Sequence, residues 1–551
     1  MIPNLFIFSL YGVTLFFNPL PTYDPFNPIK LLLISGLAVS FLLSLFFRNS
    51  ISLRRMPKKL FAFLVFSVFW SAFASIFNES PLIEDLFGAP GRNLGLISII
   101  VFIVIFSATF ISSSETMNER LLRTLNICGQ ASVIYGIAQS FGLDFFTWEG
   151  REGGIQSFFG NQNLASAFFA IFGISLFGKI VNSSKHNKEF FSSLIWLILC
   201  FISIYQTDSQ QGFIMLFLGA WLILFSKVFS KSLLAKFSFV FLSCASFLLL
   251  VLDIGRRLPW DSFFYTWTLD QRLSYIKASG QIINTFPVFG SGFGSLENLY
   301  KQFRPLESIS LPGVDAYTDT SHSIALDLAL GGGIVLLVLY LILLVTLIRN
   351  SFIVIRNPNG KEPLVIIVAL LLALSFHLNI AQGSIVMYFW SIILSAIVLS
   401  QTNKNQKIVS KLSVDSNSRI QNRSHKHSEY SDTQFLVSLI GFALGSAMIL
   451  PMLIVDSKVA TNIISGNVEA LVNLAGSFPS HSSRCAFISE TLSVNGRNSE
   501  SLFVSQLCVS QNENQLSSWK LIALNPTVDQ VTKDRAIEKW KLLDPLQPPL
   551  R

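Results

Sequence analysis

Charged side chains are scarce in this sequence. Asp, Glu, Lys and Arg together make up 13% of the 551 residues, whereas hydrophobic residues make up 51%. A soluble protein of this length carries about twice that charged fraction, so a single soluble globular fold is excluded. The hydrophobic residues are gathered in runs of about 16 to 22, which is the length of helix that crosses a bilayer core of about 30 Å.

These runs also lack the period-2 alternation of apolar and polar residues that is typical of an outer-membrane barrel. Because backbone polar groups must pair internally in lipid, the runs predict helices. The sequence therefore predicts an all-α polytopic membrane protein with about 12–13 transmembrane helices. The predicted spans begin near Leu5, Ile29, Leu60, Gly95, Leu122, Leu164, Phe191, Gly212, Phe237, Ile324, Leu364, Ile385 and Phe435.

Basic residues are few on one side of the predicted topology. They are concentrated in alternate loops, at 48–59, 120–123, 179–188, 227–236, 349–361 and 404–426. The positive-inside rule places these loops and the N-terminus in the cytoplasm, and the long loop 255–322 outside. The net charge of +8 follows from this asymmetry, so no nucleic-acid partner is needed to explain it. The first span has no basic segment before it, and we predict a retained helix rather than a signal peptide.

The chain divides into four predicted parts. They are a transmembrane core (1–401), a cytoplasmic linker (402–433), a last transmembrane helix (434–455) and an outer tail (456–551). The linker is rich in Ser, Asn, Gln and Lys, which is typical of a disordered segment. The tail places apolar residues at helical spacing, and two or three helical hairpins of the tetratricopeptide kind are one interpretation.

Cysteine is also rare, with five residues. Cys128, Cys200 and Cys244 lie in predicted spans, where cysteine behaves as a small apolar residue. Cys485 and Cys508 lie in the outer tail, in a compartment that permits disulfides. A bridge between them stays open at this point, because sequence gives no separation between the two Cα atoms. No Cys or His spacing typical of a metal site occurs, and we predict neither a metal nor a cofactor.

Ionisable side chains are nearly absent from the middle of the predicted spans. Only His377 lies well inside one, and a histidine that packs between helices is the commoner case there. Ion-coupled transporters keep charges at such depths. Since ionisable groups here gather at the outer ends of spans, the pattern favours binding or chemistry at the outer interface.

Arginine, glycine and asparagine mark the first two outer segments. Arg92 precedes a span, where it either binds a ligand or extends to the lipid headgroups. Arg151 stands before a pair of glycines, and Asn161 and Asn163 follow. Glycines let the backbone approach a ligand, and a guanidinium pairs with phosphate oxygens at two points. The asparagines either cap the next helix or bind sugar hydroxyls.

The other two outer segments are a short connection and the long loop. The connection, Thr207 to Gly212, contains Gln211. The loop carries Arg272 in a predicted amphipathic helix, a glycine-rich bend at Gly290–Gly294, and His322 near Asp315 and Asp319. A histidine beside carboxylates is suited to take a proton from a hydroxyl. The alternative is a histidine that caps the next helix, and the local sequence favours neither.

Taken in order, these four segments resemble the O-antigen ligase family and its relatives among bacterial polysaccharide polymerases, over roughly residues 86 to 335. The matching pieces are Gly91 to Leu96, Arg151 to Asn163, Thr207 to Gly212, Arg272 with the Gly290–Gly294 bend, and Ser321-His322-Ser323. The resemblance implies about twelve transmembrane helices with a large periplasmic loop. It also implies transfer of a glycan from an undecaprenyl-pyrophosphate carrier to an acceptor on the outer face of the bacterial cytoplasmic (inner) membrane, without metal or nucleotide.

The resemblance further implies roles for particular residues. His322 matches the catalytic histidine that activates the acceptor hydroxyl. The residues expected to bind pyrophosphate or glycan are Arg272, Arg151, Arg92, Asn161, Asn163 and Gln211. Two departures stand out: Asn161-Gln162-Asn163 replaces the common Asn-Pro-Asn, and Ser209-Gln210-Gln211-Gly212 lacks the arginine of the common Ser-Arg-Gly. Gln brings no charge to a phosphate, so either Arg92 or Arg151 compensates, or the donor differs.

The motifs do not separate a ligase from a polymerase or from an enzyme of O-linked protein glycosylation, so the acceptor is a lipid, a growing polysaccharide or a protein. The alternative from another class is a transporter or flippase for lipid-linked glycans, which predicts charged residues along a mid-membrane cavity. A third reading is a membrane scaffold whose tail recruits a protein partner.

Overall fold

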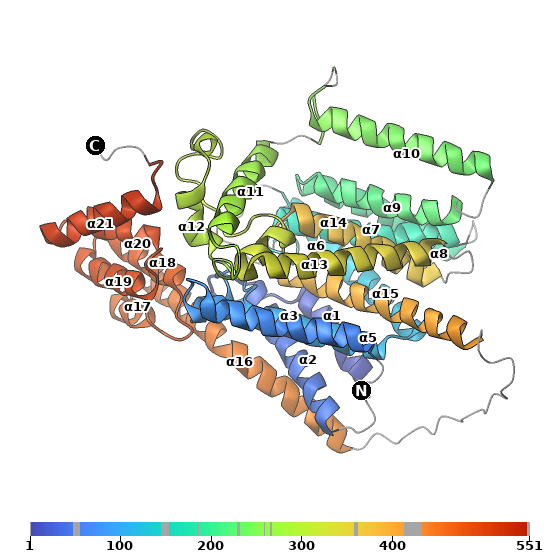
Figure 1. The fold of residues 1–551 in the computed structure, drawn as a ribbon, viewed down its shortest axis with the longest axis horizontal. Coiled ribbons are helices and arrows are strands. Elements are labelled where there is room, and N and C mark those ends of the chain that lie inside the picture. The colour runs from blue at the N-terminus through green and yellow to red at the C-terminus, as the bar shows by residue number, and fades with distance from the viewer. Residues whose placement is uncertain are drawn as a thin grey trace.

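The computed structural model describes residues 2–47, 56–144, 154–183, 187–228, 232–257, 259, 261–264, 267–356, 362–412 and 432–547. Every regular element in these ranges is a helix, as the sequence predicts. Figure 1 shows long helices packed side by side, with the short helices of the long loop and the tail gathered at one end of them.

Ten helices of the described chain are long and apolar enough to cross a membrane, which is compatible with a multi-pass membrane protein. They are α2 (Asn27–Phe47), α3 (Lys58–Phe77), α7 (Gln162–Asn182), α8 (Lys188–Gln206), α9 (Gln211–Val228), α10 (Leu233–Ile254), α13 (Ile324–Arg356), α14 (Glu362–Ile380), α15 (Ile385–Leu412) and α16 (Asp432–Ser465).

The other three predicted spans also fall on helices. Two are apolar but shorter, α1 (Ile2–Leu15) and α5 (Leu96–Ser112). The third, α6 (Glu115–Ser140), is largely buried but carries polar and charged residues along its length. Ten of the predicted spans therefore meet the length and hydropathy of a membrane-crossing helix, and the total of 12–13 transmembrane helices stays a prediction.

Small residues bring the last long helix, α16, onto α2 (Figure 1). A Cβ atom added at Gly441 of α16 would lie 2.6 Å from the Cα atom of Ser40 on α2. Close approach at small residues is the usual way that helices associate in lipid, where no hydrophobic effect acts between them. This contact anchors α16, which then leads into the tail.

The long loop forms two helices and a short 3₁₀ turn, α11 (Trp267–Thr285), α12 (Leu296–Phe303) and η2 (Leu306–Ile309). The first is the amphipathic helix that the sequence predicts around Arg272. Gly290, Gly292 and Gly294 all have positive φ, so the predicted bend depends on glycine. A further short helix, α4 (Leu82–Phe87), precedes the Arg92 segment.

The tail consists of five short helices, α17 (Val468–Leu474), α18 (Ser482–Val494), α19 (Asn498–Gln511), α20 (Leu516–Leu524) and α21 (Gln530–Leu543). Neighbouring helices pack as hairpins, α18 on α19 and α20 on α21. Cys485 and Cys508 form a disulfide across the first hairpin, with 5.6 Å between their Cα atoms. This resolves the question that the sequence left open.

The predicted part boundaries differ from the helix ends. α15 continues to Leu412, past the predicted start of the linker, and the stretch 413–431 lies outside the described residues. α16 continues to Ser465, past the predicted end of the last span. Its extension is held by Asp456, which pairs with Arg484 of the tail at 3.1 Å, so the helix joins the membrane core to the tail without a break.

Candidate functional site

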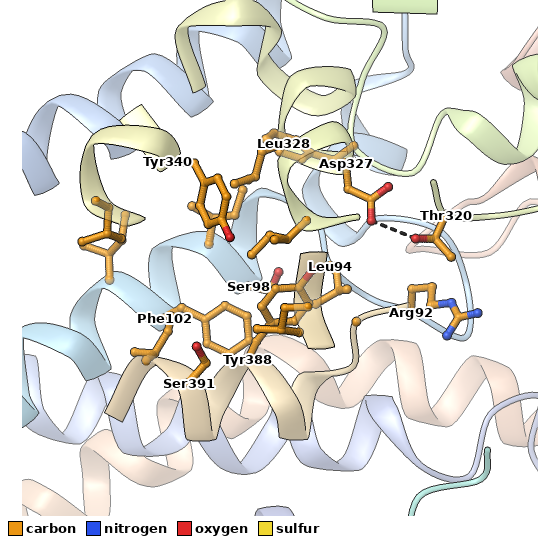
Figure 2. Close-up of a pocket in the computed structure, with 18 of the residues that line it drawn as sticks. Arg92, Leu94, Ser98, Phe102, Thr320, Asp327, Leu328, Tyr340, Tyr388 and Ser391 are labelled. Atoms are coloured by element: carbon orange, nitrogen blue, oxygen red, sulfur yellow. Dashed lines mark hydrogen bonds between the residues drawn. The ribbon is translucent and has the colours of Figure 1, made fainter. Parts of the chain in front are cut away.

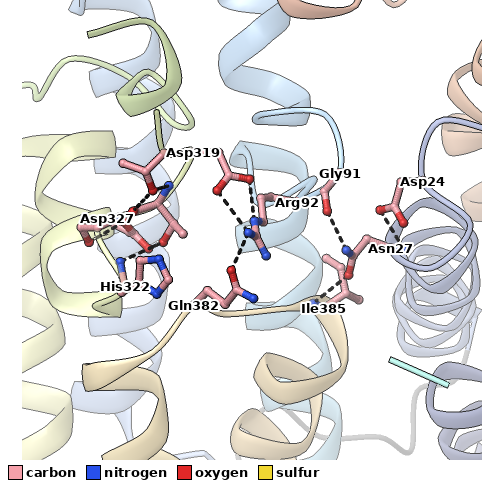
Figure 3. A network of polar contacts seen from close by, with 12 residues as sticks. Asp24, Asn27, Gly91, Arg92, Asp319, His322, Asp327, Gln382 and Ile385 are labelled. Carbon is pink, nitrogen blue, oxygen red and sulfur yellow. Dashed lines mark hydrogen bonds and ion pairs between the residues drawn. The ribbon is translucent and has the colours of Figure 1, made fainter. Parts of the chain in front are cut away.

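His322 lies in a tight turn that leads into α13. Asp327, in the first turn of that helix, reaches back and accepts hydrogen bonds from the backbone N–H of Ser321 at 2.8 Å and its hydroxyl at 2.6 Å. It also accepts one from the hydroxyl of Thr320 at 2.8 Å. His322 has a φ of 59°, a left-handed conformation that is uncommon outside glycine. The turn therefore fixes the histidine in one orientation (Figure 3).

The imidazole of His322 stacks on the ring of Tyr275 from α11, with centroids 5.5 Å apart and an angle of 17° between the planes. Its Nδ1 atom is buried and has no hydrogen-bond partner among the described residues. Burial lowers the pKa of His322 to about 3, and the positive charges of Arg272 and Arg92 act in the same direction. The imidazole is therefore neutral at neutral pH, and in the free protein it is a weaker base than an ordinary histidine.

The charge of Asp319 acts on the imidazole of His322, but Asp319 forms no described hydrogen bond with the ring. No described hydrogen bond joins the ring to a carboxylate or to the N-terminus of α13. Asp315 is exposed, and Asp319 pairs with an arginine instead. The carboxylate that positions His322 is Asp327, which acts on the turn rather than on the ring.

Arg272 extends from α11 into the same region. Its Nη1 donates to the carbonyl oxygen of Ile380 at 3.1 Å, and in the part of the chain that the structure describes it has no carboxylate partner. Burial lowers the pKa of this guanidinium from its ordinary value. A partly buried arginine without a described counter-ion beside a neutral histidine is an arrangement suited to an anionic ligand.

Arg92 is held by a carboxylate and an amide. Its Nε and Nη2 atoms lie 2.7 and 3.1 Å from the two carboxylate oxygens of Asp319, and Nη2 donates to Gln382 at 2.6 Å (Figure 3). Burial raises the pKa of Asp319, but the charge and hydrogen bond of Arg92 outweigh it and leave that pKa below its ordinary value. Arg92 lies at the site, yet its guanidinium is largely engaged.

Asn161, Asn163 and Gln211 meet one another rather than His322. Asn161 caps α7 by accepting from the backbone N–H of Asn163 at 2.8 Å. The side chain of Asn163 accepts from Ser209 at 2.8 Å, and its carbonyl oxygen accepts from Gln211 at 2.7 Å. These bonds fasten the start of α7 to the α8–α9 connection. Arg151, which the resemblance placed beside this group, lies outside the described residues.

Asp24, just before α2, and Asn27, the first residue of α2, support the Arg92 segment and were not singled out from the sequence. Asp24 accepts from the backbone N–H of Phe26 at 2.7 Å and of Asn27 at 3.1 Å, and so caps the helix. Asn27 donates to the carbonyl oxygen of Gly91 at 2.7 Å (Figure 3). An Asp three residues before an Asn-Pro pair at the start of a span is a capping signal that the sequence could have given.

Lys30 is a second ionisable residue within a predicted span that the sequence reading overlooked. It is buried in the first turn of α2, and its Nζ donates to the carbonyl oxygen of Phe158 at 2.8 Å. The rings of Phe26 and Phe159 lie 5.6 and 5.5 Å from this nitrogen. The amine thus fastens the segment before α7 and lies at a helix end, not at mid-membrane.

An apolar cavity of about 250 Å³ opens beside the turn (Figure 2). Arg92, Thr320 and Asp327 lie at one side of it, and Phe102, Tyr340 and Tyr388 at the other. Thr320 and Ile324, which flank His322 in the chain, both line it. The remaining wall is mostly Leu, Ile and Phe from α3, α5, α13, α14 and α15. The cavity therefore has a polar end next to His322 and an apolar interior.

Among the described residues no three His, Cys, Asp or Glu side chains come together as a possible metal site. No family model matches the sequence, and no curated protein matches it.

Proposed function

We propose that this protein is a membrane-embedded glycosyltransferase of the O-antigen ligase and polymerase type. It transfers a glycan from an undecaprenyl-pyrophosphate donor to a hydroxyl of a lipid, a growing polysaccharide or a protein. The reaction takes place on the outer face of the bacterial cytoplasmic membrane. The observation that carries the proposal is the neutral His322 beside Arg272, which has no described counter-ion, at the polar end of an apolar cavity.

The donor has two parts that fit this arrangement. Its pyrophosphate needs a cation, and Arg272 has guanidinium N–H groups left over after its one bond to Ile380. Its polyprenyl chain needs an apolar surface, and burial of each CH₂ group contributes about 0.8 kcal/mol. The cavity between α3, α5 and α13–α15 supplies that surface next to the same turn.

The bond changes follow from these positions. The acceptor hydroxyl attacks the anomeric carbon of the donor sugar as its proton passes to Nε2 or Nδ1 of His322. The bond from that carbon to the pyrophosphate oxygen breaks, and the leaving group gains negative charge. Arg272 stabilises this charge because it is already in position. One displacement of this kind inverts the anomeric carbon.

Bound pyrophosphate also changes the basicity of His322. Arg272 and Arg92 lower the pKa of the free histidine, so an anion between them and the ring offsets that effect and raises the pKa. The base then becomes stronger only when the donor is present. Because Gln210 brings no charge and Arg92 is engaged by Asp319, we assign the pyrophosphate contact to Arg272; Arg151 lies outside the described residues.

The pH dependence of the reaction follows from this coupling. We expect kcat/KM, which reports the free protein, to show no acid limb near the ordinary histidine pKa of 6.5, because the pKa of His322 is about 3. We expect kcat, which reports the donor complex, to show an acid limb at higher pH than kcat/KM. Initial rates across a pH series measure both. An acid limb of kcat/KM near 6.5 that disappears in His322→Gln would contradict this account.

The cavity predicts a dependence on the length of the lipid chain. Ser391 of α15 lines the cavity, and Ser391→Trp fills part of it. We expect its KM to rise on the order of tenfold for a full-length polyprenyl donor and far less for a short-chain one, because only the long chain uses the apolar interior. Ser391→Ala, which leaves the space open, is the matched control. Equal effects on both donors would place the chain elsewhere.

We further propose that the five tail helices are a tetratricopeptide-like docking module. Their hairpin pairing supports this reading.

The proposal is tested in a strain that lacks the native gene. The strain is expected to accumulate lipid-linked glycan on the outer leaflet and to lose the transferred product, and the wild-type gene is expected to restore it. A flippase predicts the opposite location, because the donor would then accumulate on the cytoplasmic leaflet.

A further inference from the structure

One contact between the tail and the membrane core is a buried carboxylate of α4, Glu84. One oxygen of Glu84 accepts from the backbone N–H of Ser482, at the start of α18, at 2.8 Å. The other accepts from the side-chain amide of Asn512, after α19, at 2.8 Å. The Glu84 side chain is almost completely buried between the two parts. Removal of either donor would leave a buried carboxylate only partly satisfied.

The same short helix carries the Arg92 segment. The backbone N–H groups of Arg92 and Asn93 both bond to the carbonyl oxygen of Ala89, at 3.1 and 2.9 Å. The segment closes back onto the end of α4 so tightly that a Cβ atom at Gly88 would lie 2.6 Å from the nitrogen of Gly95. Arg92 therefore moves with α4, and α4 is fixed by what Glu84 bonds to.

The residue after Glu84 fixes α4 to the long loop. Asp85 accepts from the backbone N–H of Phe293, in the glycine-rich bend, at 2.9 Å. It also accepts from the side chain of Asn78 at 2.5 Å. Two consecutive carboxylates thus join α4 to two different parts of the outer face, the tail and the long loop.

Other contacts show that the tail is seated on the site end of the core. Arg304, which follows α12, forms a buried ion pair with Asp544 of the tail at 2.7 Å. Tyr23 packs edge-on against Phe487 of α18, with ring centroids 5.6 Å apart. Glu297 of α12 also lies near the tail. Burial, and after it the charge of Asp319, raises the pKa of the Glu297 carboxyl group to about 8. Glu297 thus interacts with Ser483 of the tail and, through its charge, with Asp319 of the Arg92–Asp319 pair.

We propose that Glu84 is a positioning residue for the transfer reaction, through which the docked tail fixes the orientation of Arg92 and Asp319 beside His322. This inference rests on the proposed function. If the tail lost its contact with Glu84, Arg92 and Asp319 would still be present but would be displaced relative to His322.

An exchange of the two partners tests the contact. Asn512→Asp places a carboxylate against Glu84 and is expected to lower kcat/KM on the order of a hundredfold, as displacement of about 1 Å at a site does. Glu84→Gln/Asn512→Asp restores a donor–acceptor pair, since the new amide can accept from Ser482 and donate to the carboxylate introduced by the second substitution. We expect this double variant to recover activity to within a few-fold of wild type.

Glu469→Gln, at an exposed carboxylate of α17, is the matched control and is expected to behave as wild type. Protease sensitivity of the tail is measured in the same samples. Increased sensitivity with reduced transfer in Asn512→Asp, and recovery of both in the exchange variant, supports the proposal. A sensitive tail with unchanged transfer overturns it. Absence of transfer in the wild-type protein instead refutes the proposed function, and the protease result then still reports on the contact.

Discussion

Replacement of His322 by alanine is expected to lower the rate of glycan transfer by about 10² to 10⁴, the usual contribution of a positioned general base. The reason is that the two carboxylates closest to His322 in the chain among those with described hydrogen bonds, Asp319 and Asp327, are already engaged. Asp327 is occupied by three hydrogen bonds from its own turn, and Asp319 by Arg92. Release of lipid pyrophosphate by purified protein measures the effect.

Asp315→Ala provides the control, because this carboxylate belongs to the same loop but is exposed and has no proposed part in the reaction. It is expected to retain wild-type activity. His322→Ala is expected to keep its Tm within a few degrees, since the ring makes no described hydrogen bond. Full transfer by a correctly folded His322→Ala protein would refute the assignment of the base.

Arg272→Gln is expected to lower kcat/KM by about 10² to 10³, the range seen when one preorganised donor to a developing negative charge is removed. Arg272→Lys is expected to recover part of this loss, because it restores the charge but not the planar two-point geometry. Kinetics with a defined lipid-pyrophosphate donor measure both variants. Arg497→Gln, at an exposed arginine of the tail, serves as the control.

Arg272→Gln is also expected to change the pH dependence of the reaction. Because Arg272 lowers the pKa of His322 in the free protein, Arg272→Gln is expected to raise it and to move the acid limb of kcat/KM to higher pH. Loss of activity without this shift would mean that Arg272 acts at a distance from His322. Full activity of Arg272→Gln would remove it from the site.

The helices could be predicted from sequence because they depend on local patterns. Long apolar runs predict spans without knowledge of their partners. The glycines of the Gly290–Gly294 bend and the amphipathic pattern around Arg272 are likewise local, and both match the structure. The sequence singles out His322 as a histidine near Asp315 and Asp319 just before a predicted span, but it gives no indication of what surrounds the ring.

The contacts that define the site could not be predicted, because they join distant segments. Arg92 and Asp319 are 227 residues apart in the chain, and nothing near either residue indicates the other. The stacking of Tyr275 on His322 and the bonds from the tail to Glu84 are of the same kind. As a result, Arg92 was predicted to bind pyrophosphate directly, whereas its position suggests a supporting role and leaves Arg272 as the principal described cation.

We propose that His322 and Arg272 act together on a lipid-pyrophosphate donor. The most direct test of this proposal is a single-turnover experiment with purified protein in nanodiscs, a radiolabelled undecaprenyl-pyrophosphate glycan and a hydroxyl acceptor. We predict that wild-type protein releases undecaprenyl pyrophosphate in step with formation of the new glycosidic bond, and that His322→Ala binds the donor but releases undecaprenyl pyrophosphate about 10² to 10⁴ times more slowly. Equal release by the two proteins, or donor bound by neither, would contradict the account.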